Sequence, residues 1–334
     1  MLYPIELRAL IARSEERKGR SVAKPARRRD HGARKPVDGP RKPPSAAFRG
    51  TLSHPRPGGI ESPTAGAPTE ARNRIMGFMD GKRGLIVGIA NERSFAYSIA
   101  ESLHREGAEC LFTHLPGDKM ERRVRRSIDA LGIEDPWLRP LNAASDEDIE
   151  SVFKEIGEEF GKIDFLVHSI AYADKDWLQP GKFASTPREV FTQAMDISAY
   201  TYAAMANHAA PLMTEGGSMI ALSYYGAEKA VPGYNVMGVA KAALEATTRY
   251  LALELGEKNV RVNCISGGPL RTMSAMAVGG FGEILDWVEQ KAPLKRNIEG
   301  REVGDCAAFL LSGLASGMTG QCIYVDSGYA TVGL

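Results

Sequence analysis

The chain has 334 residues, of which 43% are hydrophobic, and its formal net charge at pH 7 is +1. This length accommodates one large α/β domain or two small ones, with enough apolar residues for a buried core. No stretch approaches the roughly 18 uncharged apolar residues of a membrane span, and the four cysteines and six histidines show neither metal-binding nor disulfide-framework spacing. We therefore expect a cytoplasmic protein with reduced thiols, no membrane insertion and no bound metal.

Residues 1–75 differ in composition from the rest of the chain. They contain 17 Lys and Arg against 7 Asp and Glu, and ten of the 19 prolines, whereas residues 76–334 carry 25 basic against 34 acidic residues. Such a segment buries too little apolar surface to offset its ordering entropy, so we expect it to be disordered. Disordered or non-native upstream sequence is favoured, because Met76 offers a start just before the first strand. An organelle-targeting peptide is an alternative. A nucleic-acid-binding arm is disfavoured, because no aromatic residues are interleaved with the charges.

From residue 84 onward, short apolar runs alternate with longer amphipathic segments. Strands are expected at 84–88, 109–113, 137–141, 163–169, 218–223, 260–265 and 322–325. Helices are expected at 94–106, 118–131, 146–160, 187–213, 233–255 and 303–314. This order predicts a single α/β domain over residues 76–334, a Rossmann-type, doubly wound sheet of seven parallel strands. Residues 270–300, inserted before the last helix and strand, are the only long excursion and are expected to close over a ligand.

A glycine-containing turn directly follows the first strand, with the sequence Gly88-Ile89-Ala90-Asn91-Glu92-Arg93-Ser94-Phe95. Small residues there let the backbone approach a pyrophosphate, and the helix that follows offers its free N–H groups and positive end. A plain strand-to-helix turn remains the alternative, because the strict G-x-G-x-x-G pattern is absent. After the second strand, Thr113-His114-Leu115-Pro116 provides neither an acidic group for a ribose hydroxyl nor an arginine for a 2′-phosphate, so these residues leave NADH and NADPH open.

Two tyrosine–lysine pairs compete for a catalytic role. Tyr225 and Lys229 lie four residues apart and Tyr234 and Lys241 seven apart, so either pair could share a helical face. Tyr225 ends an apolar strand, and Pro232-Gly233 interrupts any helix begun after it. Tyr234 instead stands at the start of a long helix that presents Lys241 on the same side. We therefore favour Tyr234 with Lys241.

Such a pair suits the addition of a hydride to an unsaturated substrate. Hydride addition places negative charge on a substrate oxygen, to which a nearby phenol can donate a hydrogen bond or a proton. The lysine adds a positive charge and can hold ribose hydroxyls. Tyr224, at the end of the preceding strand, is placed to face the same crevice.

Residues 76–334 closely resemble the bacterial enoyl-acyl-carrier-protein reductases, which are extended short-chain dehydrogenases. The segments that carry the resemblance include 88–97, 168–171, 195–198, 222–228, 232–241 and 268–272. The specific part is the spacing of six residues between Tyr234 and Lys241, with Tyr224 ten residues upstream. This spacing separates the family from ordinary short-chain carbonyl reductases.

The resemblance implies that Tyr234 stabilises the enolate of a thioester, that Lys241 binds the nicotinamide ribose and that Tyr224 lines the substrate channel. The residues implied to contact cofactor are Gly88, Ala90, Ser94, Phe95, Asn142, Ala143, Ser169, Ile170, Ala171, Lys241, Leu270 and Thr272. Those implied to contact substrate are Tyr224, Tyr234, Met237 and Ala171. The resemblance further implies reduction of the trans-2 double bond of enoyl thioesters, NADH as cofactor with NADPH not excluded, acyl carrier protein as partner, and a homotetramer.

Several positions depart from the family pattern. Asn142 stands where many members have Asp, Ala171 where many have Gly, and Gly268 and Leu270 where Ala and Ile are commoner. The Asn142 side-chain oxygen can still accept a hydrogen bond, whereas the methyl of Ala171 leaves the acyl chain-length preference open.

Two other functions stay open. The first is a short-chain reductase of a ketone or an imine, which would use Tyr225 with Lys229. The second is a regulator that binds a dinucleotide without oxidising it. In the favoured function, residues 270–300 would close over the acyl chain, because their apolar side chains suit a flexible hydrocarbon.

Overall fold

A sheet of seven parallel strands forms the centre of the computed structural model, which describes residues 77–273 and 275–333. The strands are β1 (Arg83–Val87), β2 (Glu109–His114), β3 (Leu138–Pro140), β4 (Phe165–His168), β5 (Gly217–Ser223), β6 (Val260–Gly267) and β7 (Cys322–Val325). Their order is β3-β2-β1-β4-β5-β6-β7, so the direction of winding reverses between β1 and β4. This confirms the predicted doubly wound sheet. The predicted disorder of residues 1–75 lies outside the described residues.

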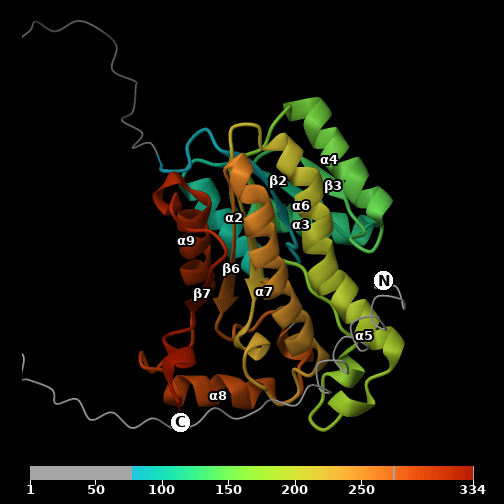
Figure 1. Ribbon diagram of the computed structural model, residues 1–334, viewed down its shortest axis with the longest axis vertical. Helices are drawn as coiled ribbons and strands as arrows, with labels where there is room; N and C mark the ends of the chain where they lie inside the picture. The colour runs from blue at the N-terminus through green and yellow to red at the C-terminus, as the bar shows by residue number, and fades with distance from the viewer. Residues whose placement is uncertain (1–76, 274, 334) are drawn as a thin grey trace, which may run out of the picture. The chain divides into compact units, whose positions relative to one another are not determined.

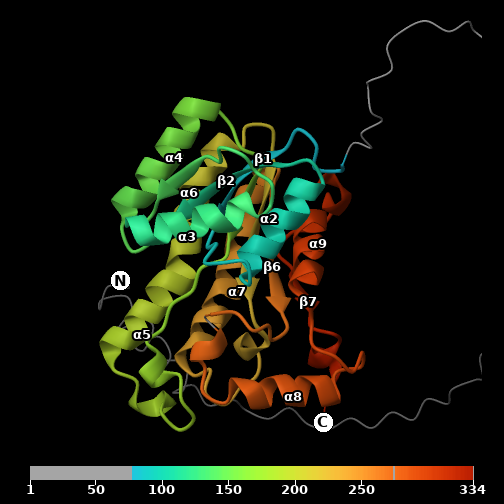
Figure 2. The same cartoon turned by 180° about the vertical axis from the view of Figure 1, so that it is seen from behind.

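Helices cover both faces of the sheet. The face in front in Figure 2 carries α2 (Phe95–Arg105), α3 (Asp118–Asp129) and α9 (Gly300–Leu311). The face in front in Figure 1 carries α4 (Asp146–Phe160), α6 (Thr201–Ala209) and α7 (Val236–Leu255). None of the helices between residues 77 and 333 that the structure describes is both long and apolar enough to cross a membrane.

The core consists of two layers, one on each side of the sheet. Leu85 and Val87 of β1 pack with α4, α6 and α7, whereas Ile86 between them packs with α2 and α9. In β4, Leu166 packs in the layer that contains α4, α6 and α7, and Val167 packs in the layer that contains α2 and α9. Because both faces of each strand are covered, every residue in the strand can be apolar. This explains why the strands could be recognised as uninterrupted apolar runs.

The helix predicted at 187–213 is interrupted. After α5 (Arg188–Met195) the chain makes a π turn at Asp196–Tyr200 before α6 continues. In this turn the Ser198 hydroxyl accepts a hydrogen bond from the N–H of Tyr172 at 3.1 Å and lies 3.3 Å from its carbonyl oxygen. A π turn inserts one residue without disturbing the apolar composition, so periodicity near 3.6 does not reveal it.

Two long excursions, rather than one, leave the sheet at its carboxyl edge. Residues 169–187 form the excursion that was not predicted, with 3-10 turns at Lys175–Trp177 and Phe183–Ser185. The predicted excursion at 270–300 contains α8 (Phe281–Lys291), which lies across the end of the sheet in Figure 1. The N–H of Gly279 donates to the carbonyl of Leu178 at 2.9 Å, which joins the two excursions.

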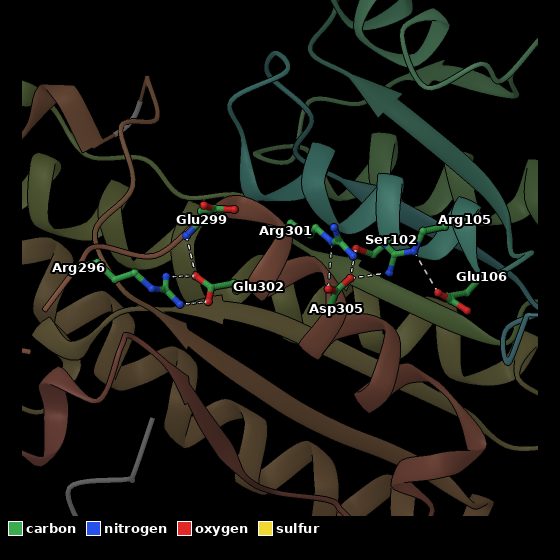
Figure 3. A network of polar contacts seen from close by, with 8 residues as sticks. All are labelled: Ser102, Arg105, Glu106, Arg296, Glu299, Arg301, Glu302 and Asp305. Atoms are coloured by element: carbon green, nitrogen blue, oxygen red, sulfur yellow. Dashed lines mark hydrogen bonds and ion pairs between the residues drawn. The ribbon is translucent and has the colours of Figure 1, made fainter. Parts of the chain in front are cut away.

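Helix α2, which follows the predicted phosphate-binding turn, is held against α9. A Cβ atom at Gly304 of α9 would lie 2.3 Å from the carbonyl oxygen of Ser98, so the two backbones touch. Next to this contact Ser102 and Arg105 of α2 both donate to Asp305 of α9, at 2.9 and 2.6 Å (Figure 3). The position of the turn therefore depends on α9, some 200 residues later in the chain.

Replacing Gly304 with alanine should lower the free energy of unfolding. Overpacking of this kind costs about 1–3 kcal/mol, which outweighs the roughly 0.5–1 kcal/mol that alanine gains over glycine inside a helix. Urea denaturation measures the change. Gly313→Ala is the control, because nothing lies within 4 Å of a Cβ atom at that position. If both variants are as stable as the wild type, the proposed contact is wrong.

Candidate active site

The turn after β1 is shaped to receive a phosphate. Gly88 has a φ of 113°, and a Cβ atom there would lie 2.2 Å from the carbonyl oxygen of Ser169, so glycine is required. The hydroxyl of Ser94 caps α2 by accepting from the N–H of Tyr97 at 3.3 Å. The other N–H groups of the first turn have no acceptor within the helix, and they stand at its positive end. An anion is the ligand that suits such a turn.

A cavity of about 580 Å³ opens where β1, β4, β5 and β6 end. In a doubly wound sheet this is the place where ligands bind, because the winding reverses there. The predicted site residues that line it are Gly88, Ala90, Ser94, Phe95, Ser169, Ile170, Ala171, Tyr224, Tyr234, Met237, Lys241, Leu270 and Thr272. The fold thus brings the turn, both tyrosines and the lysine to one space.

Asn142 and Ala143 are the predicted site residues that do not line this cavity. They follow β3, two strands away from β1. The side-chain oxygen of Asn142 accepts from the N–H of Ala144 at 3.2 Å, and its backbone N–H donates to Asp148 at 2.9 Å. An amide oxygen has a second lone pair, so a contact with adenine stays a prediction.

Two tyrosine rings meet inside the cavity. The ring centroids of Tyr224 and Tyr234 are 4.8 Å apart, and the ring planes are inclined by 70°. Gly226 makes room for them, because a Cβ atom there would lie 2.4 Å from the Tyr234 ring. Burial raises the pKa of both phenols above its ordinary value, so both stay protonated at neutral pH. Each can therefore donate a hydrogen bond.

Lys241 is a buried ammonium group, 6% exposed, whose Nζ donates to the carbonyl of Leu222 at 2.6 Å. Burial lowers its pKa to about 8. One helical turn later the carboxylate of Glu245, which favours the charged form of Lys241, accepts from the hydroxyl of Ser223 at 2.5 Å. Two successive residues of β5 therefore each hold one charged side chain of α7.

The competing pair, Tyr225 and Lys229, lies elsewhere. Neither residue lines the cavity. The Tyr225 ring makes edge contacts with Tyr329, at 5.5 Å between centroids, and with Tyr324, at 6.4 Å. Lys229 is exposed. Of the two pairs, Tyr234 with Lys241 is therefore the one that lines the cavity.

The prediction that Tyr234 and Lys241 share a helical face is wrong, because Tyr234 does not belong to the helix. The helix predicted at 233–255 begins at Val236, and Asn235 before it has a φ of 46°. Pro232-Gly233 starts a turn instead, with Gly233 at a φ of 80°. Tyr234 and Lys241 therefore line the same cavity from a turn and from a helix, and not from one helical face.

Two polar residues that hold this arrangement were not predicted. The side-chain amide of Asn235 donates to the carbonyls of Trp177, at 2.7 Å, and Gln179, at 2.8 Å, and so ties the turn to the 169–187 excursion. Glu245 holds the end of β5. A signal was available for Glu245, because it is an acidic residue one turn after a candidate lysine on an apolar helix.

One wall of the cavity is apolar. Met273, Val278, Phe281 and Ile284 from the 270–300 excursion line it, together with Leu178 from the 169–187 excursion. Other apolar residues of this excursion, which was expected to close over the acyl chain, do not line the cavity: Met276, Leu285 and Trp287. The indole N–H of Trp287 lies 3.1 Å from the Tyr329 hydroxyl. The two excursions together make a pocket for an apolar chain beside the tyrosines.

As the pH rises from 8 to 9.5, the free energy of unfolding of the ligand-free wild-type protein should increase relative to that of the Lys241→Met variant. The folded-state pKa of Lys241 is about 8, below its ordinary 10.5, so in this window the folded protein has released a proton that the unfolded chain still holds. Wild-type stability therefore rises by up to about 1.4 kcal/mol per pH unit, a contribution that the variant lacks. Urea unfolding at pH 7, 8 and 9.5 measures this. A difference between the two proteins that does not vary with pH would contradict the burial of the charge.

Comparisons with known proteins identify the family. A sequence model of the family described as Enoyl-(Acyl carrier protein) reductase matches residues 88–330. An enoyl-acyl-carrier-protein reductase (NADH) of Synechocystis sp. is 48% identical over 258 residues, which are 77% of this chain and 99% of the relative. An enoyl-acyl-carrier-protein reductase (NADPH) of Staphylococcus aureus is 46% identical over 254 residues, 76% of this chain and 98% of the relative. The crystal structure of the Bacillus cereus enoyl-acyl carrier protein reductase with NADP⁺ and indole naphthyridinone has a TM-score of 0.75 and 46% identity, and covers 78% of this chain and 100% of that chain. The chain, whose cavity holds the tyrosines and lysine expected from the resemblance, belongs to the enoyl-acyl-carrier-protein reductase family.

Proposed function

We propose that this chain reduces the trans-2 double bond of enoyl-acyl-carrier-protein thioesters in fatty-acid elongation, with a reduced nicotinamide dinucleotide as hydride donor. One observation carries the proposal: the phosphate-binding turn, the Tyr234 phenol and the Lys241 ammonium open into a single cavity that has an apolar wall. The turn suits a dinucleotide, the polar pair suits a developing negative charge, and the wall suits an acyl chain.

The residues around the turn fit a dinucleotide. The free N–H groups at the start of α2 suit its pyrophosphate, and the absence of a side chain at Gly88 lets the turn lie against the backbone of Ser169. Ser169, Ile170 and Ala171 follow β4 and line the same cavity, as do Leu270 and Thr272. When bound, the reduced nicotinamide supplies the hydride that enters at the β-carbon of the thioester. We propose NADH as the cofactor, with NADPH not excluded, since the relatives are named for one or the other.

Tyr234 holds the charge that the reaction creates. Hydride entry at the β-carbon moves negative charge to the thioester oxygen, and a phenol whose pKa burial has raised stays protonated and donates a hydrogen bond to that oxygen. The enolate is held until its α-carbon takes up a proton. Tyr224, in edge contact with Tyr234, lines the same cavity on the substrate side.

Lys241 supplies a fixed positive charge beside the phenol. With a pKa of about 8 it is mostly protonated at neutral pH. Its ammonium has three donors, one of which is used by the carbonyl of Leu222, so others remain for ribose hydroxyls. Met237 and Ala171 complete the substrate contacts that we propose, and both line the cavity.

Two alternatives receive less support. A ketone or imine reductase would use Tyr225 with Lys229, which do not line the cavity. A regulator that binds a dinucleotide without turnover would not need a phenol and an ammonium buried together, since burial of a charge costs free energy. An enoyl thioester assay with each reduced nicotinamide separates turnover from binding alone.

Acyl carrier protein is the proposed partner, and the cytoplasm is the proposed location, which the four free cysteines support. We also propose a homotetramer. Its support is an exposed apolar pair on α7, where Tyr250 is 75% and Leu253 79% exposed. Large apolar side chains that lie together at a surface are typical of an interface between subunits.

Replacing Tyr234 with phenylalanine should lower kcat for an enoyl thioester by about 100-fold or more, because the donor to the enolate oxygen is lost. Tyr225→Phe is the matched control and should retain activity, because that ring lies outside the cavity. Initial rates with crotonyl thioester and NADH measure both. Loss of activity in Tyr225→Phe alone would overturn the assignment and favour the ketone reductase.

The double variant Tyr250→Glu/Leu253→Glu should form smaller assemblies than the wild type, because charges replace the apolar pair. Light scattering after size-exclusion chromatography measures the mass of each. Leu115→Glu, at an exposed leucine beyond β2, serves as the control and should not change the assembly. A wild-type protein that is monomeric at micromolar concentration would contradict the proposed tetramer.

A further inference from the structure

Asn235, which directly follows Tyr234, has an unusual backbone conformation. Its φ of 46° and ψ of −122° are close to those of the first central residue of a type II′ turn. The N–H of Met237 donates to the carbonyl of Tyr234 at 3.0 Å and closes this turn. A type II′ turn favours glycine at this position, because a Cβ atom is crowded by the backbone there. The turn therefore holds an asparagine in a conformation that suits glycine.

The side chain of Asn235 makes contacts that glycine could not make. Its amide donates to the carbonyls of Trp177, at 2.7 Å, and Gln179, at 2.8 Å. Both carbonyls belong to the backbone of the 169–187 excursion, and the two hydrogen bonds help to offset the strain of the turn. Asn235 does not itself line the cavity. Any effect that it has on the reaction must therefore pass through a neighbour.

The turn lies where the two excursions meet. The carbonyl of Leu178, between the two carbonyls that Asn235 binds, accepts from the N–H of Gly279 in the 270–300 excursion. A Cβ atom at Gly233 would lie 2.7 Å from the carbonyl oxygen of Gly279, so the turn also packs against that excursion. An apolar cluster at this junction draws on all three segments: Leu178, Val236, Val278 and, packed against them, Tyr234. The place of the phenol therefore depends on both excursions.

We propose that Asn235 is a positioning residue for the reaction. Its strained backbone turns the Tyr234 phenol toward the substrate oxygen, and its amide ties that orientation to the excursion that covers the acyl chain. The phenol is then aligned only while the 169–187 excursion lies against the turn. Lys241 is independent of this device, because it belongs to α7 and donates to the carbonyl of Leu222. The inference rests on the proposed function, because it concerns the alignment of the phenol assigned there.

The variant Asn235→Gly separates the side chain from the backbone conformation. Glycine adopts positive φ without strain, so the turn should persist while the two hydrogen bonds are lost. We expect kcat for crotonyl thioester to fall about tenfold or more, because small displacements of a catalytic group are costly. The dissociation constant of NADH, measured by nicotinamide fluorescence, and the midpoint of urea unfolding should not change. Asn235→Asp, which has a similar size but lacks both donors, should lower kcat at least as much.

Asn259→Gly is the matched control. Asn259 also has a positive φ, of 56°, but it is exposed and does not line the cavity, so this variant should keep the kcat of the wild type. Hydrogen exchange measured by mass spectrometry adds a readout that needs no turnover. Backbone amides of residues 175–180 should exchange about tenfold faster in Asn235→Gly, because the excursion opens more often once it is released from the turn. The control should exchange there as the wild type does.

Four outcomes would refute the inference. Unchanged kcat in Asn235→Gly would mean that the amide does not align the phenol. Equal losses of kcat and NADH affinity would make Asn235 a support of the whole cavity. An equal loss of kcat in Asn259→Gly would assign the effect to glycine itself. Unchanged hydrogen exchange at 175–180 would separate Asn235 from the excursion. By contrast, faster exchange in Asn235→Gly from a wild-type protein that reduces no enoyl thioester would refute the proposed function and leave the link between turn and excursion intact.

Discussion

The buried ammonium of Lys241 is the constraint on which the rest of the site depends. Removing a charge from water costs several kcal/mol unless hydrogen bonds and an opposite charge replace the lost hydration. The carbonyl of Leu222 accepts a hydrogen bond from the ammonium, and the carboxylate of Glu245, which accepts from the Ser223 hydroxyl, favours the charged form of Lys241. These bonds fix α7 against the last residues of β5. Since Tyr224 follows Ser223 directly, the same bonds also place the first of the two phenols. The hydrogen bonds that surround the positive charge of Lys241 therefore also shape the site in which a negative charge develops during the reaction.

The strands could be predicted from the sequence because each is covered on both faces. A run such as Leu85-Ile86-Val87 has no polar alternation, and its position between loops is enough to identify it. The helices were predicted less well where their boundaries depend on particular polar contacts. The π turn at Ser198 and the late start of α7 at Val236 arise from contacts with Tyr172, Trp177 and Gln179, which are distant in the sequence. Local periodicity does not contain this information.

The candidate site was predictable to the extent that its residues follow strands. Gly88, Ser169 and Tyr224 stand at the carboxyl ends of β1, β4 and β5, and parallel strands bring such ends together. Glu245 and Asn235 could not be assigned in this way, because they act on the site through other residues. The gathering of Arg93, Arg123, Arg126 and Arg271 around a second cavity was also not predicted. These arginines lie on a turn, a helix and a loop, and in the sequence each resembles an ordinary exposed arginine.

The positive φ of Asn235 separates the two halves of the tyrosine–lysine motif. Lys241 belongs to the long helix α7. Tyr234 belongs to a turn that is held in place by the carbonyls of Trp177 and Gln179 and by close packing against the backbone of Gly279. The separation of phenol and ammonium is therefore set by tertiary packing and not by the seven-residue spacing. Transplanting residues 234–241 onto another scaffold would transfer the motif without its geometry. Conversely, substitutions in the distant 175–179 segment can change the separation of phenol and ammonium while every residue of the motif is unchanged.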